Sequence, residues 1–168
     1  MRIRKARAGD ERSIAAVIID TWKVAYRGIL PEGFLGALTT EKHEKLFKKN
    51  IADAKETVLV LENVHKEIVG VVSGGQDRSG KYDCELVAIY VLPDYQKKGF
   101  GKQLFKAFIE EQKRSKYKSM IVWAFRENRD KGFYKKLGGL VREEKSYPFA
   151  GNELPIEGYT WEDIHTVK

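Results

Sequence analysis

The segment from Ile89 to Lys113 constrains the fold of this chain most, because it has the pattern of a strand, a tight turn and a helix with no linker between them. Pro93-Asp94 marks the turn. Gly99 and Gly101 then begin a helix with an apolar face made of Leu104, Phe105, Phe108 and Ile109. The first N–H groups of a helix are unpaired and attract anions, and glycine lets a ligand approach the backbone. The segment therefore predicts an anion site at the start of this helix.

Comparison with known glycine motifs excludes two kinds of phosphate site. A P-loop requires Gly-x-x-x-x-Gly-Lys-Ser/Thr, which this chain lacks, and a dinucleotide fingerprint requires glycine at position 104, where Leu104 stands. Three lysines, Lys97, Lys98 and Lys102, add positive charge around the glycines. Spacing alone leaves two interpretations open, a phosphate-binding loop and a helix start that binds nothing.

The remaining periodicity predicts a single mixed α/β domain over residues 1–168. We expect strands near 3–8, 57–61, 67–73, 83–92, 120–125, 140–147 and 155–164. Helices are expected from Asp10 to Ala25, from Thr40 to Asn50 with Leu46 and Phe47 facing inward, after Gly99, and from about Arg129 to Leu137. Residues 28–33 are expected to end the first helix, and Gly74-Gly75 to open a polar loop.

Composition and charge by themselves exclude few classes of function. The net charge of +7 over 168 residues predicts attraction to anions, which could be nucleic acid, an acidic membrane or a phosphorylated cofactor. Cys84 is the only cysteine, so no intrachain disulfide can form. The first residues lack the apolar core of a signal peptide, and no apolar stretch approaches the length of about 18 residues that suggests a membrane span. We therefore expect a cytoplasmic protein that does not enter a membrane.

Two motifs in this element order resemble the GNAT superfamily of N-acetyltransferases. Val91-x-Pro93 followed by Gln96-x-x-Gly99-x-Gly101 has the family's Gln/Arg-x-x-Gly-x-Gly/Ala form, and residues 128–138 read Asn-x4-Phe-Tyr-x2-Leu-Gly, like the family's fourth helix. The resemblance spans nearly the whole chain. It implies a mostly antiparallel mixed sheet of about seven strands, splayed open at the fourth strand after Val91 and flanked by about four helices.

The resemblance also implies acetyl-CoA as the cofactor. Its pantetheine arm would lie in the splay like an extra strand, and backbone N–H groups of residues 97–102 would hold the pyrophosphate. Asn128 and Tyr134 would lie near the thiol end. The cofactor-binding residues implied in this way are Ile89, Tyr90, Val91, Gln96, Lys97, Lys98, Gly99, Phe100, Gly101, Lys102 and Asn128.

Acetyl transfer to an amine requires a neutral amine, a stabilised oxyanion and a protonated leaving thiolate. A lysine-like amine with a pKa near 10.4 is only about 0.1% neutral near pH 7.4, a cost of roughly 4 kcal/mol that a base or a desolvated pocket must supply. Glu85 lies on the fourth strand, nominally on one face with Val87 and Ile89, and the resemblance favours it as that base. The alternative is a structural glutamate paired with a lysine.

Tyr134 is our candidate for the acid, because a phenol can protonate a thiolate and its family counterpart commonly does so. The alternative is a core aromatic residue. We expect a backbone N–H at the splay, that of Val91, to meet the oxyanion. Cys84 is expected to be a buried strand thiol rather than a nucleophile. His43, His65 and His165 lack metal-ligand spacing, so no metal is expected.

The acceptor is the least determined part of the reaction. The segment from Trp22 to Pro31 looks like one that lines the acceptor pocket in a subset of the family, so Trp22 and Tyr26 are candidate substrate contacts, with core packing as the alternative. Trp123 and Trp161 are expected in the core or an interface. Glutamates that could attract a cationic acceptor are Glu32, Glu41 and Glu44.

The expected function is therefore direct acetyl transfer to a primary amine of a small molecule or peptide. The alternative is a catalytically inactive CoA-binding sensor domain. A nucleic-acid-binding domain is disfavoured because the chain shows neither a recognition helix nor an aromatic binding platform. Apolar alternation in the last strand suggests a homodimer surface.

Overall fold

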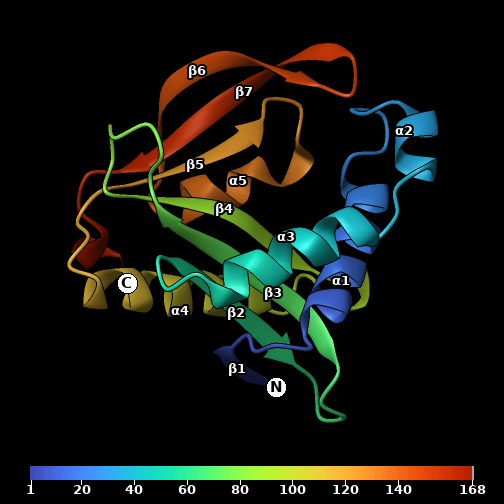
Figure 1. Cartoon of the computed structure of the whole chain (residues 1–168). Coiled ribbons are helices and arrows are strands. Elements are labelled where there is room, and N and C mark those ends of the chain that lie inside the picture. The colour runs from blue at the N-terminus through green and yellow to red at the C-terminus, as the bar shows by residue number, and fades with distance from the viewer. Residues whose placement is uncertain (168) are drawn as a thin grey trace.

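The computed structural model describes residues 1–167, in which seven strands form one mixed sheet in the order β1-β2-β3-β4-β5-β7-β6 (Figure 1). The strands are β1 (Arg2–Lys5), β2 (Glu56–Glu62), β3 (Ile68–Gln76), β4 (Cys84–Val91), β5 (Met120–Phe125), β6 (Leu140–Phe149) and β7 (Asn152–Trp161). All neighbouring strands run antiparallel except β4 and β5, which are parallel. The expected mixed, mostly antiparallel sheet is confirmed.

Residues 1–167 also contain five α-helices and three short 3₁₀ turns, of which the last follows β7. The helices are α1 (Glu11–Ala25), α2 (Glu32–Gly36), α3 (Glu41–Ala52), α4 (Phe100–Arg114) and α5 (Gly132–Lys136), and the 3₁₀ turns are Pro93–Tyr95, Arg129–Lys131 and Ile164–Thr166. No helix within residues 1–167 has the length and apolar character needed to cross a membrane.

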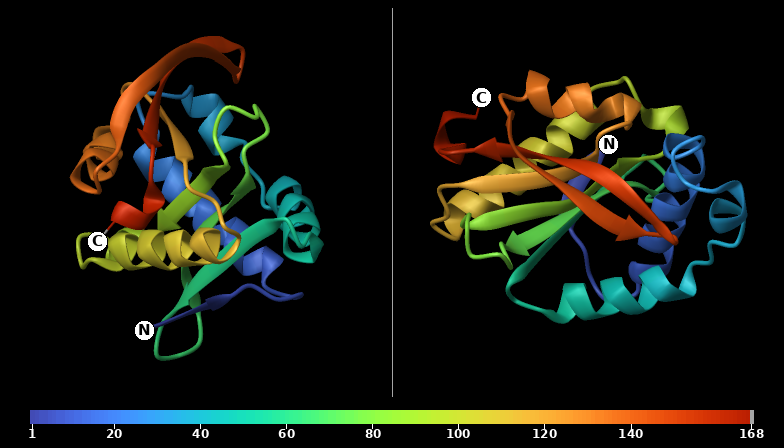
Figure 2. Two further views of the ribbon diagram at one scale, coloured as in Figure 1. Left: turned by 90° about the vertical axis from the view of Figure 1, so that its left-hand side faces the viewer. Right: turned by 90° about the horizontal axis from the view of Figure 1, so that it is seen from above.

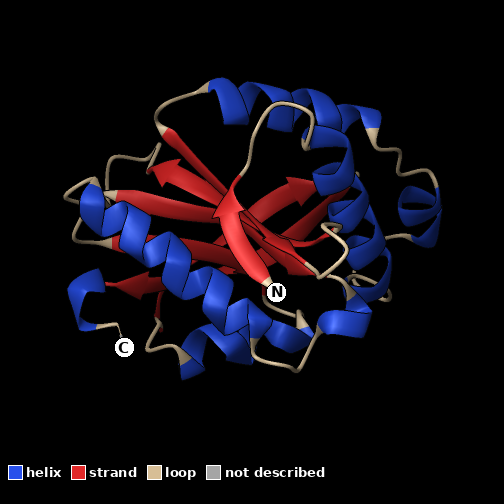
Figure 3. Cartoon of the chain, turned by 90° about the horizontal axis from the view of Figure 1, so that it is seen from below, coloured by secondary structure: helices blue, strands red, loops and turns tan. Residues whose placement is uncertain are grey.

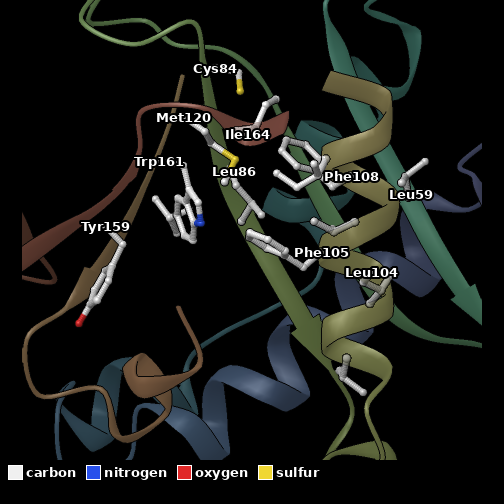
Figure 4. Packing of buried hydrophobic residues seen from close by; sticks show 14 of the residues in the cluster. Leu59, Cys84, Leu86, Leu104, Phe105, Phe108, Met120, Tyr159, Trp161 and Ile164 are labelled. Carbon is white, nitrogen blue, oxygen red and sulfur yellow. The ribbon is translucent and has the colours of Figure 1, made fainter. Parts of the chain in front are cut away.

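The helices cover the two faces of the sheet (Figures 2 and 3). Alternate residues of β2 show this directly, because Val58 and Val60 pack in the cluster with α1 and α3, whereas Leu59 and Leu61 pack in the cluster with α4. Figure 4 shows the second cluster, in which Phe105 and Phe108 point from α4 toward β4 and β5. The apolar stripe of α4 therefore fixes this helix, and its N-terminus, against the middle of the sheet.

A β-bulge in the pairing of β3 with β4 lies where β4 and β5 stop pairing. Ser73 of β3 pairs with Ala88 and the next residue, Gly74, pairs with Leu86, so Val87 is an extra residue in β4. The parallel pairing with β5 stops at the same place, since its last pair is Leu86 with Val122. Figure 1 shows the two strands separating toward their C-terminal ends. The splay expected after Val91 therefore begins earlier, at Val87, because the bulge turns the strand away.

Two local expectations were wrong, and one short helix was not expected. Gly74 and Gly75 belong to β3 rather than a loop: a Cβ would lie 2.1 Å from the Glu85 carbonyl at Gly74 and 2.4 Å from the Lys55 carbonyl at Gly75, so neighbouring backbone requires glycine at both positions. Leu46 is 47% exposed, and Phe47 alone of that pair faces the core. Residues 32–36 form the short helix α2, which begins directly after Pro31.

Candidate active site

A cavity of about 920 Å³ lies where β4 and β5 separate. It is lined by the C-terminal half of α1, the diverging parts of β4 and β5, the start of α4, the segment leading into α5, and residues of β6 near the hairpin. Most of the candidate residues identified in the sequence line it: Trp22, Tyr26, Glu85, Ile89, Tyr90, Val91, Gln96, Lys97, Gly99, Gly101, Lys102, Asn128 and Tyr134.

One end of the cavity is formed by the N-terminus of α4. Lys97 and Gly99 adopt positive φ angles of 59° and 84°, which turn the loop sharply into the helix. Within the described part of the chain, no N–H group of residues 97–102 donates to another backbone group. The positive end of α4 therefore lies at this end of the cavity with N–H groups that have no backbone acceptor, and Lys97, Gly99, Gly101 and Lys102 line it. This geometry suits a phosphate or pyrophosphate group.

Two residues of the predicted loop do not line the cavity. Lys98 turns back on its own loop, where its Nζ donates to the Asp94 carbonyl at 2.7 Å and lies 5.7 Å from the centre of the Tyr95 ring. Phe100 packs against the core cluster around α4. Arg129 and Lys136 line the cavity instead, and the sequence offered no signal for them because the fold of the α5 segment places them.

The open edge of β4 supplies the second element of the site. The Leu92 N–H donates to the Val69 carbonyl of β3 at 2.9 Å, so the strand alternation directs the N–H groups of Val91 and Ile89 to the opposite side, into the splay. The Val91 carbonyl on that side accepts a hydrogen bond of 2.8 Å from Nε2 of Gln96. Gln96 thereby fixes the loop to the strand end and leaves the two N–H groups free.

Glu85 is half-buried on the wall of the cavity. Burial, followed by the nearby Asp77 carboxylate, raises its pKa above the ordinary value. Lysine pairing, the alternative for this residue, is not seen among residues 1–167, where Glu85 forms no ion pair within 4.0 Å. A glutamate of raised pKa without a cationic partner can exchange a proton at the cavity wall.

The face on which Glu85 lies differs from the expectation. Leu86 and Ile89 both pack in the cluster on the α4 side although three positions separate them, because Val87 is the extra residue of the bulge. Glu85 therefore lies on the opposite face, together with Tyr90, which packs toward α1. Glu85 does not share the face of Ile89, and it lies on the α1 side of the cavity.

Tyr134 enters the cavity from α5, across the opening from β4. Its ring lies 5.4 Å from the rings of both Phe133 and Tyr159. Burial, followed by the nearby Tyr90 phenol, raises the pKa of Tyr134 well above the ordinary value. The phenol therefore keeps its proton at neutral pH. Asn128 lies close by in the chain, and its Oδ1 accepts a 2.9 Å hydrogen bond from the Asp130 N–H, which orders the turn before α5.

The end of the cavity away from the α4 loop is aromatic. Trp22 of α1 and Tyr26, directly after this helix, line it, and the hydroxyl groups of Tyr26 and Tyr90 lie 3.3 Å apart. The sequence analysis missed the rings that β5 and β6 contribute: Trp123, Phe125, Tyr147 and Phe149. Trp123 was expected in the core or an interface, whereas it lines the cavity with Lys145 Nζ 4.0 Å from its ring centre. Trp161 is core, at 4% exposure.

The structure also shows where the remaining candidate residues lie. Glu32, Glu41 and Glu44 do not line the cavity, whose carboxylates come from Asp77, Glu85 and Asp130. Cys84 is fully buried, and burial raises the pKa of its thiol to about 12, so it remains protonated as expected of a strand thiol. Within residues 1–167 no group of three or more histidine, cysteine, aspartate or glutamate side chains is arranged to hold a metal ion.

Comparisons with known proteins agree with this geometry. Residues 54–138 match the model of the acetyltransferase (GNAT) domain family. An uncharacterized N-acetyltransferase of Bacillus subtilis, YuaI, is 30% identical over 99% of this chain and 95% of its own length. A probable N-acetyltransferase of Mycobacterium tuberculosis, Rv2775, is 24% identical over 95% of this chain and 92% of its own length.

Solved structures share the fold. The PaiA N-acetyltransferase of Thermoplasma acidophilum, solved in complex with coenzyme A, superposes with a TM-score of 0.72 at 20% identity and covers 93% of this chain and 96% of its own. The ribosomal-protein-alanine N-acetyltransferase of Brucella melitensis superposes with a TM-score of 0.75 at 21% identity, over 96% of this chain and 99% of its own.

Proposed function

This chain belongs to the GNAT acetyltransferases, a family of acyltransferase enzymes, and from this premise we propose that it transfers the acetyl group of acetyl-CoA directly to a primary amine of a small molecule or peptide. The observation that carries the proposal is the continuity of the cavity: the unpaired N–H groups of the α4 loop, the open edge of β4 and the half-buried Glu85 line one space.

The residues present fit the cofactor. The N–H groups of residues 97–102, with Lys97 and Lys102, would bind its pyrophosphate. The free edge of β4 would hydrogen-bond its amide-containing arm as a neighbouring strand would. A Cβ at Gly101 would already lie 3.5 Å from the Phe133 ring, so a large side chain there would close this channel. When bound, acetyl-CoA supplies the acetyl group as a thioester.

Three groups of this chain would perform the chemistry. Glu85 accepts the proton that the amine loses, directly or through a water molecule. The N–H groups of Ile89 and Val91, fixed by the strand, donate to the carbonyl oxygen as negative charge develops on it. Tyr134, kept protonated by burial, donates its proton to the departing thiolate. Base and acid thus reach the opening from opposite sides, Glu85 from β4 and Tyr134 from α5.

Calorimetric titration with acetyl-CoA, followed by a thiol-release assay with a panel of amines, tests the proposal. We expect saturable binding and turnover, and loss of both in Gly101→Trp, because the indole would fill the channel beside Phe133. Gln103→Ala, an exposed position on the same helix outside the cavity, is the matched control. No binding at millimolar acetyl-CoA would overturn the proposal. Binding without turnover on any amine would instead support a CoA-binding sensor.

A further inference from the structure

Helix α5, which carries Tyr134, is too short to hold its own position. It has only five residues, and Tyr134 stands in the middle of it and lines the cavity. A helix of this length is not stable by its own hydrogen bonds, so contacts with the rest of the molecule must fix it. The residues that make these contacts therefore determine where the phenol lies.

One row of side chains on β7 contacts α5 from its middle to its end. Glu157, Tyr159 and Trp161 occupy alternate positions of the strand and so share one face, and the last two belong to the core cluster of Figure 4. Trp161 donates from Nε1 to the Leu137 carbonyl at 3.0 Å, directly after α5. The Tyr159 ring lies 5.4 Å from the Tyr134 ring. The first member of the row, Glu157, is left for the start of the helix.

Glu157 joins the start of α5 to the sheet. Its carboxylate accepts a hydrogen bond of 2.8 Å from the Tyr159 hydroxyl and lies 3.4 Å from Nζ of Lys131, the residue directly before α5. The same Nζ donates to the Arg126 carbonyl, just past the end of β5. Nε of Arg126 lies farther from the carboxylate, at 3.8 Å. One carboxylate thus holds both the start of the helix and the ring beside Tyr134.

The surroundings of Glu157 strengthen these contacts. Its side chain is only 12% exposed. Burial opposes its charge, but the hydrogen bond from Tyr159 and the contact with Lys131 bring its pKa below the ordinary value, so it is ionised at neutral pH. Hydrogen bonds to an ionised acceptor are shorter and stronger than neutral ones. Glu157 lies outside the cavity, so it reaches the reacting groups only through other residues.

We propose that Glu157 is a positioning residue for Tyr134, which fixes α5 through Lys131 and Tyr159 so that the phenol is held at the opening between β4 and β5. This inference rests on the proposed acetyl transfer, in which Tyr134 gives its proton to the departing thiolate. A shift of about 1 Å in a reacting group can cost about 10²-fold in rate. Glu157 itself exchanges no proton in the reaction.

The first test measures kcat in a thiol-release assay with acetyl-CoA and an amine that the parent protein acetylates. We expect Glu157→Ala to lower kcat at least about 10-fold, because α5 loses its tie to the sheet. The effect on acetyl-CoA affinity should be smaller, because the α4 loop and the edge of β4 stay in place. Glu157→Gln keeps an oxygen for the Tyr159 hydroxyl and loses the charge that faces Lys131, so its kcat should lie between the two.

Glu144→Ala is the matched control. Glu144 lies directly opposite Glu157 in the pairing of β6 with β7, and it contacts Arg126 at 2.8 Å. The substitution therefore removes a neighbouring carboxylate that shares the Arg126 contact and leaves the contacts of Glu157 with Lys131 and Tyr159 intact. We expect kcat to equal that of the parent protein.

A double variant separates positioning from a general loss of stability. If Glu157 acts through Tyr134, its replacement has nothing further to remove once the phenol is gone. We therefore expect Glu157→Ala to leave kcat unchanged in the Tyr134→Phe background. A glutamate that only stabilises the fold would lower kcat by the same factor in both backgrounds.

Hydrogen exchange adds a readout that needs no turnover. The N–H groups of residues 137–139 bond to carbonyls of α5, so their exchange reports on the opening of this helix. We expect at least about 10-fold faster exchange there in Glu157→Ala, with the parent rate retained in α4. Tyr159→Phe keeps the ring and removes the hydroxyl, so it should accelerate the same amides and serves as the second variant if Glu157→Ala does not fold.

The outcomes distinguish this inference from the proposed function. Unchanged exchange of residues 137–139 in Glu157→Ala and Tyr159→Phe would overturn the positioning role. An equal loss of kcat with and without the Tyr134 hydroxyl, or in Glu144→Ala, would overturn it as well. Parental turnover in Tyr134→Phe, or no turnover by the parent protein on any amine, would instead refute the proposed chemistry. Exchange would then still decide whether Glu157 fixes the helix of Tyr134.

Discussion

Tyr134 illustrates how burial assigns a role to a single side chain. Its phenol lines the cavity but is surrounded by Phe133, Tyr159 and Tyr90, and burial raises its pKa, so it can donate a proton and does not serve as a base at neutral pH. We predict that Tyr134→Phe lowers kcat about 10²-fold with little change in acetyl-CoA affinity. Thiol release and calorimetry measure the two quantities. Tyr117→Phe, outside the cavity, is the control, and unchanged turnover in Tyr134→Phe would refute the acid role.

Glu85 is a second single residue with a defined role, because its protonation should determine how kcat depends on pH. A base acts when deprotonated, and burial together with Asp77 raises the pKa of Glu85, so kcat should fall as the pH drops through a value above the ordinary 4.5. We predict that Glu85→Gln removes this acid limb and lowers kcat about 10²-fold. Arg78 lowers the pKa of Glu85, so Arg78→Gln should move the limb to higher pH. If kcat fell over the same acidic pH range in both variants as in the parent protein, another group would be the base. The measurement is kcat against pH at saturating acceptor.

At the scale of elements, the site depends on how β4 is joined to α4. The bulge at Val87 opens the strand, and Gln96 ties the loop to the Val91 carbonyl, so the free N–H groups of strand and helix face one space. We predict that Gln96→Leu lowers acetyl-CoA affinity about 10-fold and costs about 1 kcal/mol of unfolding free energy, because the carbonyl loses its partner. Calorimetry and urea unfolding test this against Gln103→Leu on the exposed face of α4. Equal effects in the two variants would contradict a positioning role for Gln96.

At the scale of the whole molecule, the cavity divides the sheet where β4 and β5 pair through only three residue pairs. A ligand in the splay contacts both parts and should stabilise the fold as a whole. We predict that acetyl-CoA at about 100 times its Kd raises the unfolding free energy by about 2.7 kcal/mol, and that removing it by dialysis reverses the gain. Thermal unfolding with and without ligand measures the shift. Gly101→Trp should show no shift, and an equal shift in that variant would place the ligand elsewhere.

The sequence alone determined the elements and the loop at the start of α4. Period-two and helical patterns are set by local backbone geometry, so β5 was found at its observed bounds and α1 and α4 within a few residues. Gly99, Gly101 and Gln96 indicate the loop that we propose binds the anion, because backbone conformation and the residues at a helix start are local properties. Two motifs, together with the element order, were enough to indicate the family.

Only the tertiary structure decided which side chains line the aromatic end of the cavity. The bulge at Val87 depends on the pairing of β4 with β3, and it moved Glu85 to the side of α1. Phe149 and Trp22 are far apart in the chain, and they meet because the β6–β7 hairpin reaches over toward α1 and α2 (Figure 1). Contacts between segments distant in sequence depend on the packing of the whole sheet, which no local pattern encodes. The same physical reason explains why Arg129 and Lys136 line the cavity. Lys98, central in the motif, turns away through local contacts with Asp94 and Tyr95.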